Sequence, residues 1–132
     1  MELIQNNATE ILILLFLIVT FLQSGVDKVT DWSGNLSFIK DHFKNSPFKN
    51  LVPLLLGIIL VIEIIAGAFM FVGIFNIITT GSKELALLGV QLSALTLIFL
   101  LIGQRLAKDY AGAMTLAVYF LITVFGMFLL NK

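Results

Sequence analysis

The stretch LLLGIILVIEIIAGAFMFVGIF, residues 54–75, decides the fold class of this chain. A helix crosses the hydrocarbon core of a bilayer with about 20 apolar residues, and this stretch is long enough to do so. Glu63 interrupts it near its middle. A charged side chain at the centre of a membrane helix is costly and as a rule faces the interior of the bundle. The stretch therefore predicts a membrane-spanning helix with one acidic side chain turned toward other helices.

Three further stretches have the same apolar character. A backbone in lipid must satisfy its own hydrogen bonds, which favours helices over other structures. We therefore expect an all-α, polytopic membrane protein, a four-transmembrane-helix bundle in a single domain over residues 1–132. The predicted spans are residues 8–26, 51–75, 85–103 and 111–130.

The composition narrows the chemistry. Of the 132 residues, 59% are hydrophobic and 12% are charged, and the formal net charge is zero. Soluble domains average about 25% charged residues, so this chain belongs to the membrane class. It has no cysteine and one histidine. The sequence therefore predicts no disulfide, no thiolate metal site, no covalent or metal cofactor and no nucleic-acid partner.

The connection between the first two predicted spans is long, covering residues 27–50. Within it, Leu36, Ile39 and Phe43 recur at helical spacing, and Trp32 precedes them. This pattern is typical of a short helix in the membrane interface with an aromatic anchor. A polar loop packed over the end of the bundle is the alternative.

Basic residues predict the orientation, because cytoplasmic connections carry an excess of lysine and arginine. Two basic residues, Lys83 and Lys132, lie on the side of the termini. The first and third connections hold Lys28, Lys40, Lys44, Lys49, Arg105 and Lys108. We therefore expect a multi-pass protein of the inner (cytoplasmic) membrane, with the long connection in the cytoplasm and both termini outside.

Glu63 has no lysine or arginine at the same depth in the other predicted spans. The sequence therefore predicts no ion-pair partner within the chain. Burial penalises the charged form, so we expect a protonated carboxyl unless a ligand or a second subunit supplies a cation. The candidate ligand or proton site gathers polar residues of similar depth: Glu63, Tyr119, Thr96, Thr20 and Gln91. These side chains equally fit hydrogen bonds that only hold the helices together.

A second polar cluster is predicted at the cytoplasmic end of the bundle. Asp27 and Arg105 are placed to pair across the bundle there, and basic groups at this level can meet lipid phosphate or an anionic ligand. Ordinary solvation at the membrane surface is the alternative, because long basic side chains extend their charges toward water. The cluster comprises Gln23, Asp27, Lys28, Arg105 and Asp109.

Two patterns combine in the first two spans. FLQSGVDK, residues 21–28, has the form Phe-x-x-x-Gly-x-x-Lys, and EIIAGAFMFVGIF, residues 63–75, has the form Glu-x-x-x-Gly-x-x-x-x-x-Gly. The glycines of the two patterns, Gly25, Gly67 and Gly73, form a packing motif, since small residues let membrane helices approach closely. In a four-span chain of this length, the patterns resemble the DoxX family of small bacterial membrane proteins, with its methylamine-utilisation relatives.

The resemblance implies a four-helix bundle in the bacterial inner membrane. Members of the family are linked to thiosulfate:quinone oxidoreductase and to membrane complexes of thiol stress. We therefore expect an accessory subunit of an oxidoreductase complex without activity of its own, with quinone or lipid as ligand and other membrane subunits or a second copy as partners. The absence of cysteine speaks against direct thiol chemistry. A small proton-coupled transporter, or a scaffold without chemistry, is the alternative.

Overall fold

The computed structural model describes residues 2–44, 49–106 and 109–131 of the chain, which fold almost entirely into helices. The predicted all-α class is confirmed. The helices are α1 (Glu2–Asn6), α2 (Ala8–Thr30), α3 (Trp32–His42), the 3₁₀ turn η1 (Lys49–Leu51), α4 (Val52–Thr80), α5 (Glu84–Leu106) and α6 (Tyr110–Leu130).

Four of these helices, α2, α4, α5 and α6, are long and apolar enough to cross a membrane. They coincide with the four predicted spans, but three of them run past the apolar stretches. The fourth helix in the chain, α4, continues to Thr80 and ends where Gly81 adopts φ 79°. Glycine has no Cβ and tolerates this left-handed conformation, and its amide donates to the carbonyls of Asn76 and Ile77. Because α4 extends beyond Phe75, Glu63 lies nearer to its start than to its end.

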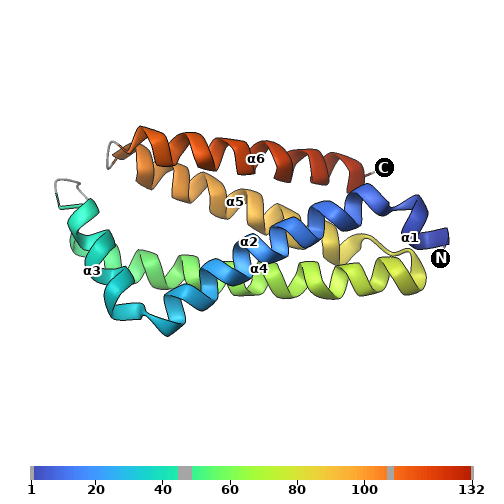
Figure 1. Cartoon of the computed structure of the whole chain (residues 1–132), viewed down its shortest axis with the longest axis horizontal. Helices are drawn as coiled ribbons and strands as arrows, with labels where there is room; N and C mark the ends of the chain where they lie inside the picture. The colour runs from blue at the N-terminus through green and yellow to red at the C-terminus, as the bar shows by residue number, and fades with distance from the viewer. Residues whose placement is uncertain (1, 45–48, 107–108, 132) are drawn as a thin grey trace.

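The four long helices form an antiparallel bundle, and α4 runs along one edge of it in this view (Figure 1). Helix α4 packs against both α2 and α5, and α5 packs against α6, whereas α2 contacts α6 less extensively. The two termini lie at one end of the bundle, and α3 lies at the other, beside the start of α4 (Figure 1). We call the latter the α3 end. The predicted short helix of the first connection is thus confirmed as α3.

The core of the bundle is apolar and closely packed. Its fully buried side chains include Leu14 and Leu17 of α2 and Met70 and Ile77 of α4. The outer surface is apolar as well, as expected for helices in contact with lipid. Its most exposed large side chains, between 65% and 70% exposed, are Leu12, Phe71, Phe38, Met114 and Leu121.

Glycines mark the closest helix contacts. A Cβ on Gly73 would lie 2.5 Å from the Cα of Ala86, so α4 and α5 meet backbone to backbone at this point. Gly67 faces the side chain of Leu22 on α2, and Gly25 faces Ile64 on α4. The three predicted packing glycines therefore lie at interfaces of α4, where small residues permit close approach.

Candidate functional site

A cleft of about 420 Å³ opens in the bundle toward the α3 end. It is bounded by α2, α5 and α6, with Glu63 of α4 and Asn35 of α3 also lining it. Its apolar wall is formed by Val19, Phe21, Leu97, Leu100 and Leu116, and its polar groups are Thr20, Gln23, Ser24, Asp27, Lys28 and Tyr119.

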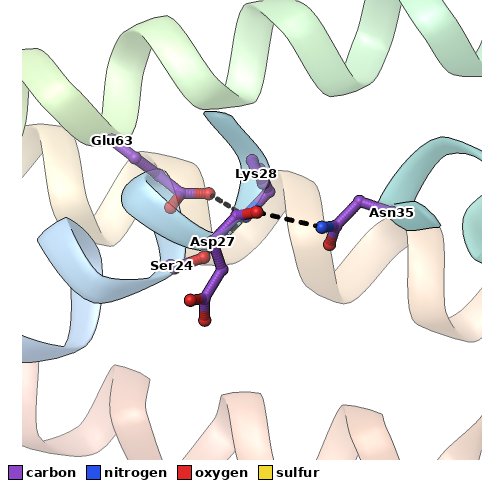
Figure 2. Close-up of polar contacts among 5 residues, drawn as sticks. All are labelled: Ser24, Asp27, Lys28, Asn35 and Glu63. Carbon is purple, nitrogen blue, oxygen red and sulfur yellow. Dashed lines mark hydrogen bonds and ion pairs between the residues drawn. The ribbon is translucent and has the colours of Figure 1, made fainter. Parts of the chain in front are cut away.

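An ion pair lies in this cleft. The Lys28 Nζ is 3.0 Å from Glu63 Oε1, and the side chains are 13% and 1% exposed respectively (Figure 2). The prediction that Glu63 has no charged partner in its own chain is wrong. The expectation of a neutral carboxyl rested on that premise and loses this support.

The direction of the side chains explains why Lys28 reaches a residue of the neighbouring span. In every α-helix the Cα–Cβ bonds lean toward the helix N-terminus. Lys28 lies in the last turn of α2, so its side chain leans back into the bundle. Because α4 is antiparallel to α2, Glu63 leans toward the α3 end. The two side chains therefore converge, although their positions along the spans differ.

The pair is incompletely satisfied. Besides Glu63, the Lys28 ammonium donates to Ser24 Oγ one turn earlier on α2 (Figure 2). The second carboxylate oxygen of Glu63, Oε2, is buried and has no hydrogen-bond partner among the described residues. Nearly all buried polar atoms in proteins have such a partner, so this oxygen calls for an explanation.

The structure separates the five predicted ligand-site residues. Tyr119 and Thr20 line the cleft together with Glu63. The Thr20 hydroxyl donates to the carbonyl of Phe16 in its own helix, at 2.8 Å. Thr96 is fully buried but does not line the cleft, and it bonds the carbonyl of Leu92. Gln91 is exposed on the surface of α5 and does not line the cleft.

The predicted cluster at the cytoplasmic end also divides. Gln23, Asp27 and Lys28 line the cleft, so one part of this cluster and the Glu63 group form a single site. Asp27 is exposed, and its carboxylate points away from the Lys28–Glu63 pair (Figure 2). No ion pair joins Asp27 to Arg105 in the part of the chain that the structure describes.

Arg105 and Asp109 serve the turn between α5 and α6. The guanidinium of Arg105 lies 5.1 Å from the ring centroid of Tyr110, a cation–π geometry. Asp109 caps α6 by accepting the amide of Gly112 at 3.0 Å. Lys108, which was counted for the orientation, lies outside the described residues.

Asn35 is a residue of the cleft that the sequence did not indicate. Its Nδ2 donates to the backbone carbonyls of Asp27, at 3.1 Å, and Asp31, at 2.8 Å (Figure 2). These bonds tie α3 to the end of α2 and thereby hold α3 beside the mouth of the cleft. The sequence gives no signal for this role of Asn35. Its bond to Asp27 crosses the break between α2 and α3, and helical periodicity does not indicate contacts across such a break.

The chemistry of the donor set bears on the ligand. The described residues contain no group of three or more histidine, cysteine, aspartate or glutamate side chains that would suit a metal ion. The cleft instead combines a charged hydrogen-bonding pair with an apolar wall. Ligand sites of this kind suit a molecule with a small polar head and an apolar body.

A second ion pair lies at the opposite end of the bundle. Lys83 Nζ is 3.5 Å from Glu10 Oε2 and ties the start of α2 to the turn before α5. Both side chains are more exposed than Glu63, at 25% and 12%. Comparison with known proteins adds no assignment to either pair: no protein-family model, no curated protein and no solved structure matches the chain.

Proposed function

We propose that this chain is a DoxX-like accessory subunit of a membrane oxidoreductase complex, and that its cleft binds a membrane-soluble ligand of the quinone or lipid class at Glu63. The observation that carries the ligand site is the Lys28–Glu63 pair: both residues line the cleft, and the buried Oε2 of Glu63 has no partner among the described residues. The sequence resemblance in the first two spans supports the assignment to a complex.

The residues of the cleft fit the head group of such a ligand. Lys28 and Tyr119 can donate hydrogen bonds, Glu63 can accept one, and Leu97, Leu100 and Leu116 supply an apolar wall. A bound quinone would supply two-electron redox chemistry coupled to protons. We propose Glu63 as the group that holds or releases a proton beside it, since one of its carboxylate oxygens has no partner among the described residues.

A purely structural role for the pair explains the observations less well. A buried ion pair adds little net stability, and an apolar pair of similar volume often does as well or better. An unpaired carboxylate oxygen further weakens the pair as a structural contact. Such an arrangement is what a site kept for binding or proton exchange would retain.

A small proton-coupled carrier is the second candidate. The observation in its favour is the same one: a buried carboxylate whose cation partner comes from another helix, so that a proton or a cationic solute can compete with Lys28. Many carriers, however, build their sites from interrupted helices. Here α2, α4, α5 and α6 are continuous where they are described.

The test is purification in mild detergent followed by mass spectrometry of the proteins and lipophilic molecules that accompany the chain. We expect a redox protein partner and a bound quinone or lipid, with the ligand lost in Glu63→Gln and Lys28→Met. Gln91→Leu is the matched control, because it also removes a polar side chain from a span but lies outside the cleft. Ligand retention in all three variants would contradict the site, and proton-coupled solute uptake by the isolated chain in liposomes would favour the carrier.

A further inference from the structure

The Lys28–Glu63 pair has one hydrogen-bond donor and one acceptor left over, on two side chains that both line the cleft. An ammonium group has three N–H donors, and two of those of Lys28 are used by Glu63 Oε1 and Ser24 Oγ. An ionised carboxylate only accepts hydrogen bonds, and Oε2 of Glu63 accepts none from the described residues. A hydroxyl both donates and accepts, so a single hydroxyl group satisfies both atoms.

The cleft has an apolar side between α2 and α6. These two helices touch where the rings of Phe16 and Tyr119 lie 6.1 Å apart, edge to face, and, nearer to the termini, where Ile13 packs against Gly126. Toward the α3 end α2 diverges from α6 (Figure 1). Val19 and Leu116 line the cleft from these two helices, and Val19 is 60% exposed on the apolar outer surface. The cleft is therefore continuous with the surface that faces lipid.

We infer that the cleft takes a membrane-soluble amphiphile with a hydroxyl head group, and that this molecule enters sideways from the bilayer between α2 and α6. The hydroxyl donates to Glu63 Oε2 and accepts from Lys28, and the apolar body lies along Val19 and Leu116. This inference rests on the proposed function and narrows its ligand class. A head group with carbonyl acceptors alone would leave Oε2 unpaired, whereas a phenol or hydroquinone pairs both atoms.

A matched pair of ligands tests the head group without altering the protein. A long-chain 4-alkylphenol and its methyl ether, each with a diazirine in the tail, are titrated against the chain in phosphatidylcholine nanodiscs. Loss of a hydrogen bond to a charged group corresponds to a weakening of at least about tenfold, so the phenol should bind that much more tightly than the ether. Equal binding of the two, or binding of neither, overturns the inference.

Variants then connect the preference to Glu63. We expect Glu63→Leu to remove the preference for the phenol, and Gln91→Leu to keep it. If Glu63→Leu does not fold, Glu63→Gln retains an acceptor but lacks the charge, and the preference should shrink. After irradiation the tail label should lie on α2 and α6. Label confined to α3, at the other side of the mouth, would contradict lateral access.

A chemical bridge tests the route directly, because the chain contains no native cysteine. A short bis-maleimide reagent, whose double bonds add the two thiols, joins Val19→Cys to Leu116→Cys across the apolar side of the cleft. The control bridge joins Ile13→Cys to Gly126→Cys, where α2 and α6 already touch. The first bridge should slow association of the phenol about tenfold or more, and the second should leave it unchanged. Equal rates overturn lateral access.

The two proposals fail in different ways. If a natural ligand still accompanies the wild-type chain and is lost in Glu63→Gln, the proposed site stands even when the phenol shows no advantage or the bridge has no effect. If no ligand depends on Glu63, the proposed site and the inference both fall.

Discussion

Lys28 and Glu63 carry opposite charges in a part of the bundle where few atoms can solvate them. The Glu63 side chain is 1% exposed and that of Lys28 is 13% exposed. Removing one partner of a buried pair leaves the other charge uncompensated, which costs more than the pair contributes in net stability. The two partners differ in whether their side chains can reach water at the membrane surface. Lys28 lies in the last turn of α2 and can turn toward the α3 end, whereas Glu63 is fixed deep in α4.

We therefore predict that Lys28→Met destabilises the fold by about 3 kcal/mol, a cost typical of a buried charge that loses its partner. Glu63→Gln should cost less, about 1 kcal/mol, because the lysine regains solvation by extending its charge to the membrane surface. Unfolding in mixed micelles with increasing denaturing detergent measures both values.

The control is Lys83→Met, which breaks the more exposed pair with Glu10. It should cost less than about 1 kcal/mol, the value of a partly solvated pair. In a double-mutant cycle, Lys28→Met combined with Glu63→Met should cost clearly less than the sum of the single changes. Strict additivity would mean that the two side chains do not interact in the folded protein.

At the scale of elements, the interface of α4 with α5 is fixed by Gly73. An added methyl group there would lie 2.5 Å from the Cα and N of Ala86, and backbone atoms cannot move aside as a flexible side chain can. Gly57 lies in the same helix, and an added Cβ meets no atom of the described chain within 4 Å. The two glycines thus form a matched pair.

Gly73→Ala should destabilise the bundle by about 1–3 kcal/mol, the usual range for overpacking a tight contact. Gly57→Ala should be close to neutral, since alanine fits a helix interior at least as well as glycine. The same unfolding titration measures the difference. An equal, small effect at both positions would show that α4 and α5 do not approach as closely as described.

The existence of the four long helices could be predicted from composition, whereas the positions of their ends depend on local residues and contacts and could not. The apolar runs at residues 8–26, 51–75, 85–103 and 111–130 each exceed the length of a span, so their helices follow from the sequence. Their ends did not follow, because the polar residues Asn76, Thr79 and Thr80 still continue α4 until Gly81 stops it. That error placed Glu63 at the middle of its span.

The candidate site could be predicted only in part, because contacts between helices decide which of its residues come together. Comparing positions by depth alone grouped Thr96 and Gln91 with Glu63, although Thr96 bonds within its own helix and Gln91 faces outward. It also separated Lys28 from Glu63, because depth along a span ignores the length and lean of a lysine side chain. Tertiary packing decides which faces of the helices meet. A helix that is apolar on all sides has no sequence pattern that marks its buried face.

At the scale of the whole molecule, the bundle is asymmetric in charge along its long axis. The α3 end carries Lys28, Lys40, Lys44 and Arg105, while Lys83 lies at the end with the termini. The positive-inside rule therefore predicts that the α3 end, with the polar mouth of the cleft, faces the cytoplasm.

Single cysteines in this cysteine-free chain measure the orientation. Thr80→Cys and Ser37→Cys place exposed thiols near the two ends of the bundle. A membrane-impermeant maleimide added to intact cells should label the first, and it should label the second only after the membrane is opened. Labelling in the reverse order would place the termini and the start of α5 in the cytoplasm.

The contact between Lys28 and Glu63 is the centre of the account, and solid-state NMR in lipid bilayers measures it most directly. Chain labelled with ¹⁵N at lysine Nζ and ¹³C at glutamate Cδ should show strong dipolar dephasing of the Glu63 carboxyl signal, as expected for Nζ and Oε1 3.0 Å apart. The signal is assigned by its loss in Glu63→Gln, and its dephasing should vanish in Lys28→Met while that of Glu10 beside Lys83 remains. A Glu63 signal that is not dephased in the wild-type chain would contradict the pair and the site built on it.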